Sequence, residues 1–86
     1  MRVTVQSFAR LRELAGRQEW ACEVAAGATV AEVWQAFATA FPPVAAMRAA
    51  VSCAVNADFA SMETVVQDGD EVAFLPPVSG GATRYP

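Results

Sequence analysis

Histidine and lysine are both absent from this 86-residue sequence, and six arginines carry all of its positive charge. Without histidine the chain lacks the commonest general base and metal ligand. Without lysine it can neither form a Schiff base nor offer a lysine acceptor for modification. The net charge of −3 argues against a nucleic-acid-binding surface, which needs clustered positive charge. We therefore expect no metal site, no nucleic acid and no enzyme built on these side chains.

Long apolar runs are also absent. The longest uncharged stretch lies between Glu32 and Arg48 and contains Gln35 and two prolines. It falls short of the roughly 20 apolar residues of a membrane span. The N-terminus enters a strand-like alternation directly, without a basic region and an apolar block, so we expect no signal peptide, no membrane partner and a cytoplasmic location.

Cysteine is scarce. Cys22 and Cys53 are far apart in the sequence, form no CxxC motif, and each lies in a strand-like stretch among apolar neighbours. This setting favours two buried thiols that act as small hydrophobic residues. A disulfide or a reactive thiol is the alternative.

A chain of this length closes one hydrophobic core, so the sequence predicts a single domain. Alanine is its commonest residue and contributes little buried area per side chain. The larger candidates for the core are Val3, Val5, Leu11, Leu14, Val24, Val30, Val33, Phe37, Val55, Val65, Val72 and Phe74.

The first half of the chain alternates between strand and helix patterns. Period-two alternation over residues 2–8 predicts a strand in which Phe8 closes an otherwise polar face. Residues 9–15 carry leucines at helical spacing, and Gly16 follows as a C-cap. Residues 18–24 alternate again, and the short connection predicts that this second strand pairs antiparallel with the first.

A longer helix is predicted next. Thr29 and Glu32 have the spacing of a capping box at its start, and Pro42 and Pro43 end it before another short helical turn up to residue 50. Apolar residues at helical spacing form the face expected to cover a sheet. They are Val30, Val33, Trp34, Phe37 and Ala38.

The second half predicts strands. Residues 51–55 form a buried strand, 56–58 a turn, 59–66 an irregular stretch with one short strand, and 71–75 a last strand after a turn at 68–70. The order of elements predicts an α+β domain, a mixed sheet packed against one main helix on a single face. This arrangement is a β-grasp.

Two groups of residues resemble ligand-binding sites, one a metal site and one a phosphate loop, but the sequence favours neither interpretation. Asp68, Asp70 and Glu71 form the only acidic cluster, and aspartates at such positions usually hydrogen-bond their own turn rather than a metal. Ser79 beside the glycine pair 80–81 resembles part of a phosphate loop, but nothing after it can form the helix that such a loop needs.

The C-terminal segment is the most distinctive feature. We expect the domain to span residues 1–75, an extended tail to span 76–81, and five further residues to form an extension, 82–86. The tail begins with two prolines, which favour an extended exit. Gly80 and Gly81 end it and can thread a channel too narrow for other residues. This pattern suits delivery of a terminal carboxyl group into another protein, and a surface loop or linker is the alternative.

Three segments together form a more specific pattern: FARLRELAG at 8–16, DGDEVAFL at 68–75 and PPVSGG at 76–81. With them, residues 1–81 resemble the small subunit of molybdopterin synthase, in the MoaD/ThiS family of ubiquitin-like sulfur carriers. The FARLRELAG insertion distinguishes these subunits from the thiamine-pathway carrier and from ubiquitin. The resemblance implies a ubiquitin-like β-grasp.

The same resemblance implies a function. An E1-like adenylyltransferase would activate the Gly81 carboxylate with ATP, and a sulfur donor would convert it to a thiocarboxylate. The large synthase subunit would then receive the tail, and sulfur would pass to cyclic pyranopterin monophosphate. The carrier itself would bind no cofactor. The alternatives are a carrier for another pathway (cysteine, methionine or a thiolated secondary metabolite) and a ubiquitin-like interaction module or protein modifier.

The resemblance also implies a docking face. Phe8, Phe59 and Leu75 would form an exposed apolar patch, with Arg12 adding a charge contact at its rim. The alternative for Phe59 is an ordinary core position. The tail residues expected to enter a partner are Pro76, Pro77, Val78, Ser79, Gly80 and Gly81.

The extension departs from the family pattern, in which the chain ends at the second glycine. Adenylation needs a free carboxylate on Gly81, whereas here that carbonyl is held in an amide bond. Either a protease, of the JAMM metalloenzyme type, removes residues 82–86, or these residues were introduced by cloning. Regulated processing is more typical of carriers that serve pathways other than molybdopterin.

Overall fold

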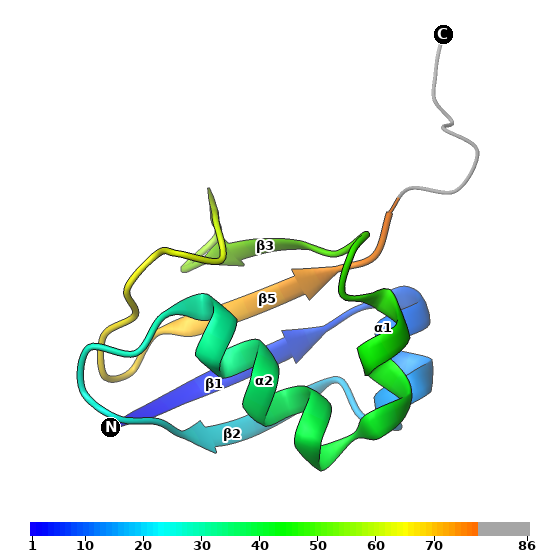
Figure 1. Ribbon diagram of the computed structural model, residues 1–86, viewed down its shortest axis with the longest axis horizontal. Helices are drawn as coiled ribbons and strands as arrows, with labels where there is room; N and C mark the ends of the chain where they lie inside the picture. Colours follow the sequence, from blue (N-terminus) through cyan, green and yellow to red (C-terminus); the bar gives the residue numbers. More distant parts are fainter. Residues whose placement is uncertain (78–86) are drawn as a thin grey trace, which may run out of the picture.

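The computed structural model describes residues 1–77, which are coloured in Figure 1. Within that range the elements in chain order are β1 (Arg2–Ser7), α1 (Ala9–Ala15), β2 (Glu19–Glu23), α2 (Val30–Ala40), the 3-10 helix η1 (Pro42–Met47), β3 (Ser52–Val55), β4 (Asp58–Ala60) and β5 (Glu71–Leu75). These bounds agree closely with the predicted ranges, and β4 is the expected short strand after the turn. None of these helices is long and apolar enough to cross a membrane.

One sheet contains all five strands of residues 1–77, in the order β2-β1-β5-β3-β4. The central strands β1 and β5 are parallel, and the other neighbouring pairs are antiparallel. Helix α2 crosses a single face of this sheet (Figure 1). The structure is therefore the α+β domain with a mixed sheet and one main helix that the sequence predicts, and its topology is that of a β-grasp.

Helix α2 begins at the predicted capping box. The Glu32 backbone N–H donates to Thr29 Oγ1 (3.4 Å), and the Thr29 N–H donates to Glu32 Oε1 (2.9 Å). Each residue thereby satisfies a backbone donor that the first helical turn leaves free. The apolar stripe that follows is turned to the sheet, where Val30, Val33, Trp34 and Phe37 are buried.

Aromatic rings fill the space between α2 and the sheet. The Phe37 ring is fully buried, and its centroid lies 5.5–6.0 Å from those of Trp20, Trp34, Phe41 and Phe74. These rings come from β2, α2, the end of α2 and β5. Phe37 therefore joins the helix to an edge strand and to a central strand at once.

Most of the predicted core residues are fully buried, but the assignment of Val65 to the core is wrong. Val65 is 51% exposed, whereas its neighbour Val66 is 1% exposed. The Val66 N–H donates to the Ala28 carbonyl (2.9 Å), and Val65 forms an isolated bridge with Thr29. Neighbours in an extended chain point to opposite sides, so this pairing decides which valine faces inward.

The end of β1 also differs from the prediction. The strand stops at Ser7, which is 1% exposed and whose hydroxyl donates to the Arg17 carbonyl (2.7 Å). Phe8 is the N-cap of α1 rather than the last residue of the strand. The hydrogen bond from Ser7 to Arg17 joins the two residues that flank the segment 8–16, the α1 insertion. Gly16 is the C-cap of α1, as predicted, and has a φ of 77°.

The two cysteines are free and buried, as the sequence favours. Cys22 lies in β2 and Cys53 in β3, and two strands separate these in the sheet. That spacing, about 14 Å at ~4.8 Å per strand, is too wide for a disulfide. Burial raises the pKa of both thiols above the ordinary value of 9.0, with Glu23 adding to the rise at Cys22 and Arg48 opposing it at Cys53.

We expect Phe37→Ala to lower the free energy of unfolding by about 3–5 kcal/mol, because it removes a fully buried ring and leaves a cavity. Phe59→Ala is the matched control, since Phe59 is 87% exposed and its loss should cost no more than about 0.5 kcal/mol. Urea unfolding followed by tryptophan fluorescence measures both. Similar losses for the two variants would contradict this description of the core.

Both thiols should react with iodoacetamide roughly tenfold or more slowly in the folded protein than in urea, because the thiolate is the nucleophile and burial disfavours it. The raised pKa values also predict a pH dependence of stability. The contribution of the two protonated thiols is complete below pH 9.0, the ordinary pKa, and is lost as pH rises through the higher values of the folded state. Replacing both cysteines with alanine should remove that alkaline component.

Candidate functional site

The end of β5 meets the start of α1, and this junction gathers four of the six predicted docking residues that the structure describes. Along β5, Val72 and Phe74 are buried against α2, so alternation places Leu75 on the open face of the sheet. Ser7 of β1 is paired with Phe74. The next residue of β1's chain, Phe8, therefore continues beside Leu75.

A hollow of about 460 Å³ lies at this junction. Its lining comes from the start of α1, the end of η1 and the end of β5, and comprises Phe8, Ala9, Arg10, Met47, Leu75, Pro76 and Pro77. The lining is mostly apolar, and Phe8 is 38% exposed. The structure thus brings four predicted residues together: Phe8, Leu75 and the two prolines at the root of the tail.

An unusual backbone conformation positions Phe8. Phe8 itself is extended, with φ −130° and ψ 155°, but Ala9 has a φ of 50°, which residues other than glycine seldom adopt. The chain turns sharply there, so α1 begins at an angle to β1 while Leu11 is anchored in the core. Phe8 is left at the surface, where it forms one wall of the hollow.

Phe59 lies on the same face of the sheet but outside the hollow. It is paired with Ala54, which in turn is paired with Ala73 of β5, and paired residues share a face. Phe59 therefore lies two strands away from β5, on the face that also carries Leu75. Its exposure of 87% shows that the alternative of an ordinary core position is wrong.

Two arginines of α1, Arg10 and Arg12, lie differently relative to the hollow. Arg12 is exposed on α1, does not line the hollow, and has no ion-pair partner within residues 1–77. Arg10 does line it and forms an ion pair with Glu13 (3.1 Å). Arg10 belongs to the segment FARLRELAG but was not predicted to be a docking residue. Met47 was not predicted either, since it reaches the hollow only because η1 packs against α1.

The tip of the predicted tail, Val78, Ser79, Gly80 and Gly81, lies outside the described residues, as does the extension 82–86. Of the predicted tail, the structure describes the root, Pro76 and Pro77.

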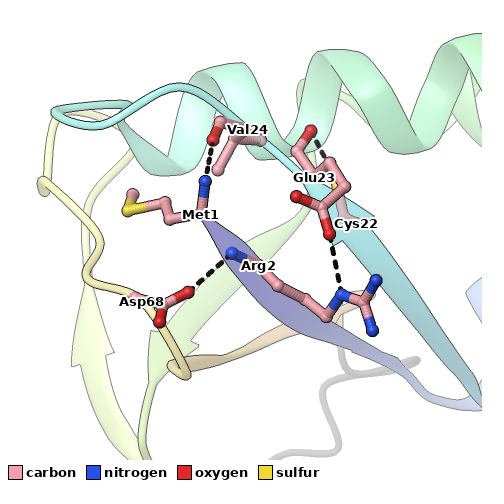
Figure 2. A network of polar contacts seen from close by, with 6 residues as sticks. All are labelled: Met1, Arg2, Cys22, Glu23, Val24 and Asp68. Atoms are coloured by element: carbon pink, nitrogen blue, oxygen red, sulfur yellow. Dashed lines mark hydrogen bonds and ion pairs between the residues drawn. The ribbon is translucent and has the colours of Figure 1, made fainter.

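The acidic cluster lies elsewhere and is engaged in the fold. Asp70 accepts from the Gln67 N–H (2.7 Å) in its own turn, as predicted, and from Asn56 Nδ2 (2.9 Å). Asp68 instead accepts from the Arg2 N–H of β1 (2.7 Å), as Figure 2 shows. Within the described range no three acidic or cysteine side chains are grouped to hold a metal ion.

Comparison with known proteins identifies the chain's relatives. A molybdopterin synthase sulfur carrier subunit from Arabidopsis thaliana is 33% identical over 79 residues, which cover 92% of this chain and 82% of the relative. The subunit of the same name from Escherichia coli strain K12 is 38% identical over 82 residues, covering 92% of this chain and 99% of the relative.

Solved structures agree on the fold. The crystal structure of SAMP1 from Haloferax volcanii matches with a TM-score of 0.83 and 27% identity, covering 94% of this chain and all of that one. A putative molybdopterin converting factor subunit 1 from Pyrococcus furiosus matches with a TM-score of 0.81 and 31% identity, covering 91% of this chain and 99% of that one.

The model of the ThiS family matches residues 5–81, so the match includes β5, the prolines of the hollow and the glycine pair. Residues 82–86 follow the matched range. The resemblance that the sequence suggests is confirmed, and this chain belongs to the ThiS family, whose members among its relatives include the sulfur carrier subunits of molybdopterin synthase.

Proposed function

We propose that this chain is the sulfur carrier subunit of a molybdopterin synthase and carries sulfur as a thiocarboxylate on Gly81. The observation that supports this most directly is the family match, which extends through the glycine pair of a tail rooted in an exposed apolar hollow. Relatives that are 33% and 38% identical, with 82% and 99% of their length covered, bear that name.

The proposed cycle has two activating steps and one delivery. An E1-like adenylyltransferase joins the Gly81 carboxylate to AMP from ATP, releasing pyrophosphate. A sulfur donor then displaces AMP, leaving a thiocarboxylate in place of the carboxylate. The large synthase subunit accepts the tail, and the sulfur passes to cyclic pyranopterin monophosphate. ATP is used by the partner, in the cytoplasm, and the carrier holds no cofactor.

The hollow supplies the docking surface in this proposal. Phe8 and Leu75 offer an apolar surface at the root of the tail, and the adjoining prolines set the direction in which the tail leaves. Phe59 lies farther out on the same face, and Arg12 lies on the α1 side. The E1-like enzyme and the large subunit would cover this same surface in turn, because both must receive the one tail.

Phe8→Asp combined with Leu75→Asp should weaken binding to the large subunit by roughly 100-fold, because an interface closed over these positions would bury unpaired carboxylates. Isothermal calorimetry measures the affinity, and circular dichroism checks the fold. Val65→Asp is the control, since Val65 is exposed away from the hollow. Phe59→Asp should have a smaller effect because Phe59 lies two strands away. Unchanged binding in the double variant would contradict the proposed surface.

Residues 82–86 raise a separate question, because Gly81 must end in a free carboxylate before it can be adenylated. The proposal requires that a protease, of the JAMM metalloenzyme type, removes these five residues, unless they were introduced by cloning. Processing of this kind also fits the second candidate function, a protease-activated carrier that supplies sulfur to cysteine, methionine or a secondary metabolite.

A chain ending at Gly81 should be adenylated by the E1-like enzyme with ATP and, when sulfide is supplied as the sulfur donor, should release AMP and carry sulfur in place of one carboxylate oxygen. The full chain should stay unchanged until residues 82–86 are removed. Intact mass spectrometry reads both steps. Gly81→Ala in the shortened chain is the control for the narrow channel of the partner, because the added side chain should hinder entry of the tail. Adenylation of the full chain, or none of the shortened one, would contradict the proposal.

One observation favours a further candidate. The structure of SAMP1 from Haloferax volcanii matches with a TM-score of 0.83. A second matching structure is that of small archaeal modifier protein 1 from the same organism. The alternative function is therefore a ubiquitin-like protein modifier. The two candidates separate in one experiment: a modifier forms amide bonds from Gly81 to lysines of other proteins, whereas the sulfur carrier returns to a free Gly81 carboxylate after each transfer.

A further inference from the structure

A second groove lies between α2 and the edge strand β2, on elements that do not line the hollow at the tail root. The indole of Trp20 forms its floor, and one side of α2 forms its wall. Its lining residues are Trp20, Glu32, Gln35, Ala36, Thr39 and Ala40. Figure 1 shows β2 at the edge of the sheet with α2 lying across it. The groove therefore runs alongside an open sheet edge.

The backbone of β2 is free on that side. Met1 and Val24 exchange two hydrogen bonds (2.8 and 2.9 Å). In an antiparallel pair, residue pairs that exchange hydrogen bonds alternate with pairs that do not, so this contact fixes which residues of β2 bond to β1. Cys22 and Trp20 then bond to β1, while Glu19, Ala21 and Glu23 direct their N–H groups outward. Among residues 1–77 those donors have no backbone partner, and the Glu23 carbonyl receives only a weak contact from Cys22 Sγ (3.8 Å; Figure 2).

Acidic side chains border this edge on both faces of the sheet. Glu19 and Glu23 lie on the open face. One oxygen of Glu19 accepts from Gln6 Nε2 (2.8 Å), and one oxygen of Glu23 accepts from Arg2 Nε (2.8 Å; Figure 2). Glu32 lies on the α2 side, in the lining of the groove. The second carboxylate oxygens of Glu19 and Glu23 accept no hydrogen bond within residues 1–77. Arg2 forms an ion pair with Glu23 and offsets part of its charge, so an incoming strand would meet net negative charge mainly beside Glu19 and Glu32.

These charges disfavour a second copy of the chain as the occupant. Antiparallel pairing of two β2 strands centred on Ala21 would place Glu19 of one copy opposite Glu23 of the other, twice over. Like charges directly opposite one another destabilise a strand pair, and charged edge strands are a known barrier to self-association. The edge therefore favours a strand of opposite charge over a second copy of this chain, even though Arg2 offsets part of the charge of Glu23.

We propose that the β2 edge binds an extended segment of another protein in which apolar residues alternate with arginine or lysine. The segment adds a strand to the sheet through the outward N–H groups of β2. Its apolar side chains lie in the groove against Trp20 and Ala36, and its basic side chains lie on the open face beside Glu19 and Glu23. This interaction is separate from the docking of the tail root, and both can occur at once.

The test is an amide NMR titration of the chain with a capped nonapeptide that alternates valine and lysine. A second peptide of the same composition, with its valines and lysines in two blocks, controls for charge alone. The alternating peptide should shift the amides of residues 19–23 and 35–40, and the block peptide should bind roughly tenfold more weakly. Equal binding of the two peptides, or shifts confined to the turn at 68–70, would overturn the proposal.

Variants locate the contact. Ala21→Pro removes a donor that β1 does not use, and proline is tolerated in edge strands, so the fold should persist while peptide affinity falls roughly tenfold. Thr39→Arg fills the groove with bulk and positive charge from an exposed site. Ala49→Arg makes the same change in charge at an exposed position outside the groove and should leave affinity unchanged. Equal affinity of the two arginine variants, or self-association through β2, would refute the assignment even if Ala21→Pro did not fold.

Discussion

The contact between Phe37 of α2 and Phe74 of β5 determines where the rest of the molecule lies. Their rings are stacked, with centroids 5.9 Å apart and planes 14° apart, and both side chains are fully buried. Because side chains alternate along a strand, burying Phe74 places Leu75 on the opposite face and directs the chain out of the sheet at Pro76. A slip of one residue in β5 would bury Leu75 and expose Phe74. The core therefore fixes the position of the proposed docking surface.

The α1 insertion supplies the other half of that surface, and its placement depends on two buried contacts. Leu11 is fully buried, and the Ser7 hydroxyl reaches the Arg17 carbonyl at 2.7 Å, so both the middle and the ends of the insertion are held. The positive φ of Ala9 then leaves Phe8 at the surface beside Leu75. The tail root is thus bordered by a rigid element, although α1 is only seven residues long and would be unstable alone.

Local patterns in the sequence were enough to predict the strands, both α-helices and the capping box, because each depends on residues close together in the chain. Choices that depend on distant pairing were not predictable. Val65 and Val66 are equally apolar, and only the pairing of this segment with residues 28–30 decides which is buried. Met47 lies in no motif, and the motif that contains Arg10 does not indicate what Arg10 faces, because the hollow exists only where three segments distant in sequence meet. The pairing of Phe59 with β3 places its side chain on the open face of the sheet, so Phe59 is exposed and does not belong to the core.

The size of the hollow has a consequence for the proposed cycle. A carrier that gives its tail first to an activating enzyme and then to an acceptor must leave each partner before it can meet the next. Small apolar surfaces support weak, exchangeable complexes, whereas permanent ones bury much larger areas. In the proposed cycle, a patch made of Phe8, Leu75 and two prolines would give enough affinity to position the tail without holding the partner. The specificity of each encounter would then come from the fit of the glycine pair inside the partner, so that the folded domain positions the tail and the partner's channel selects it.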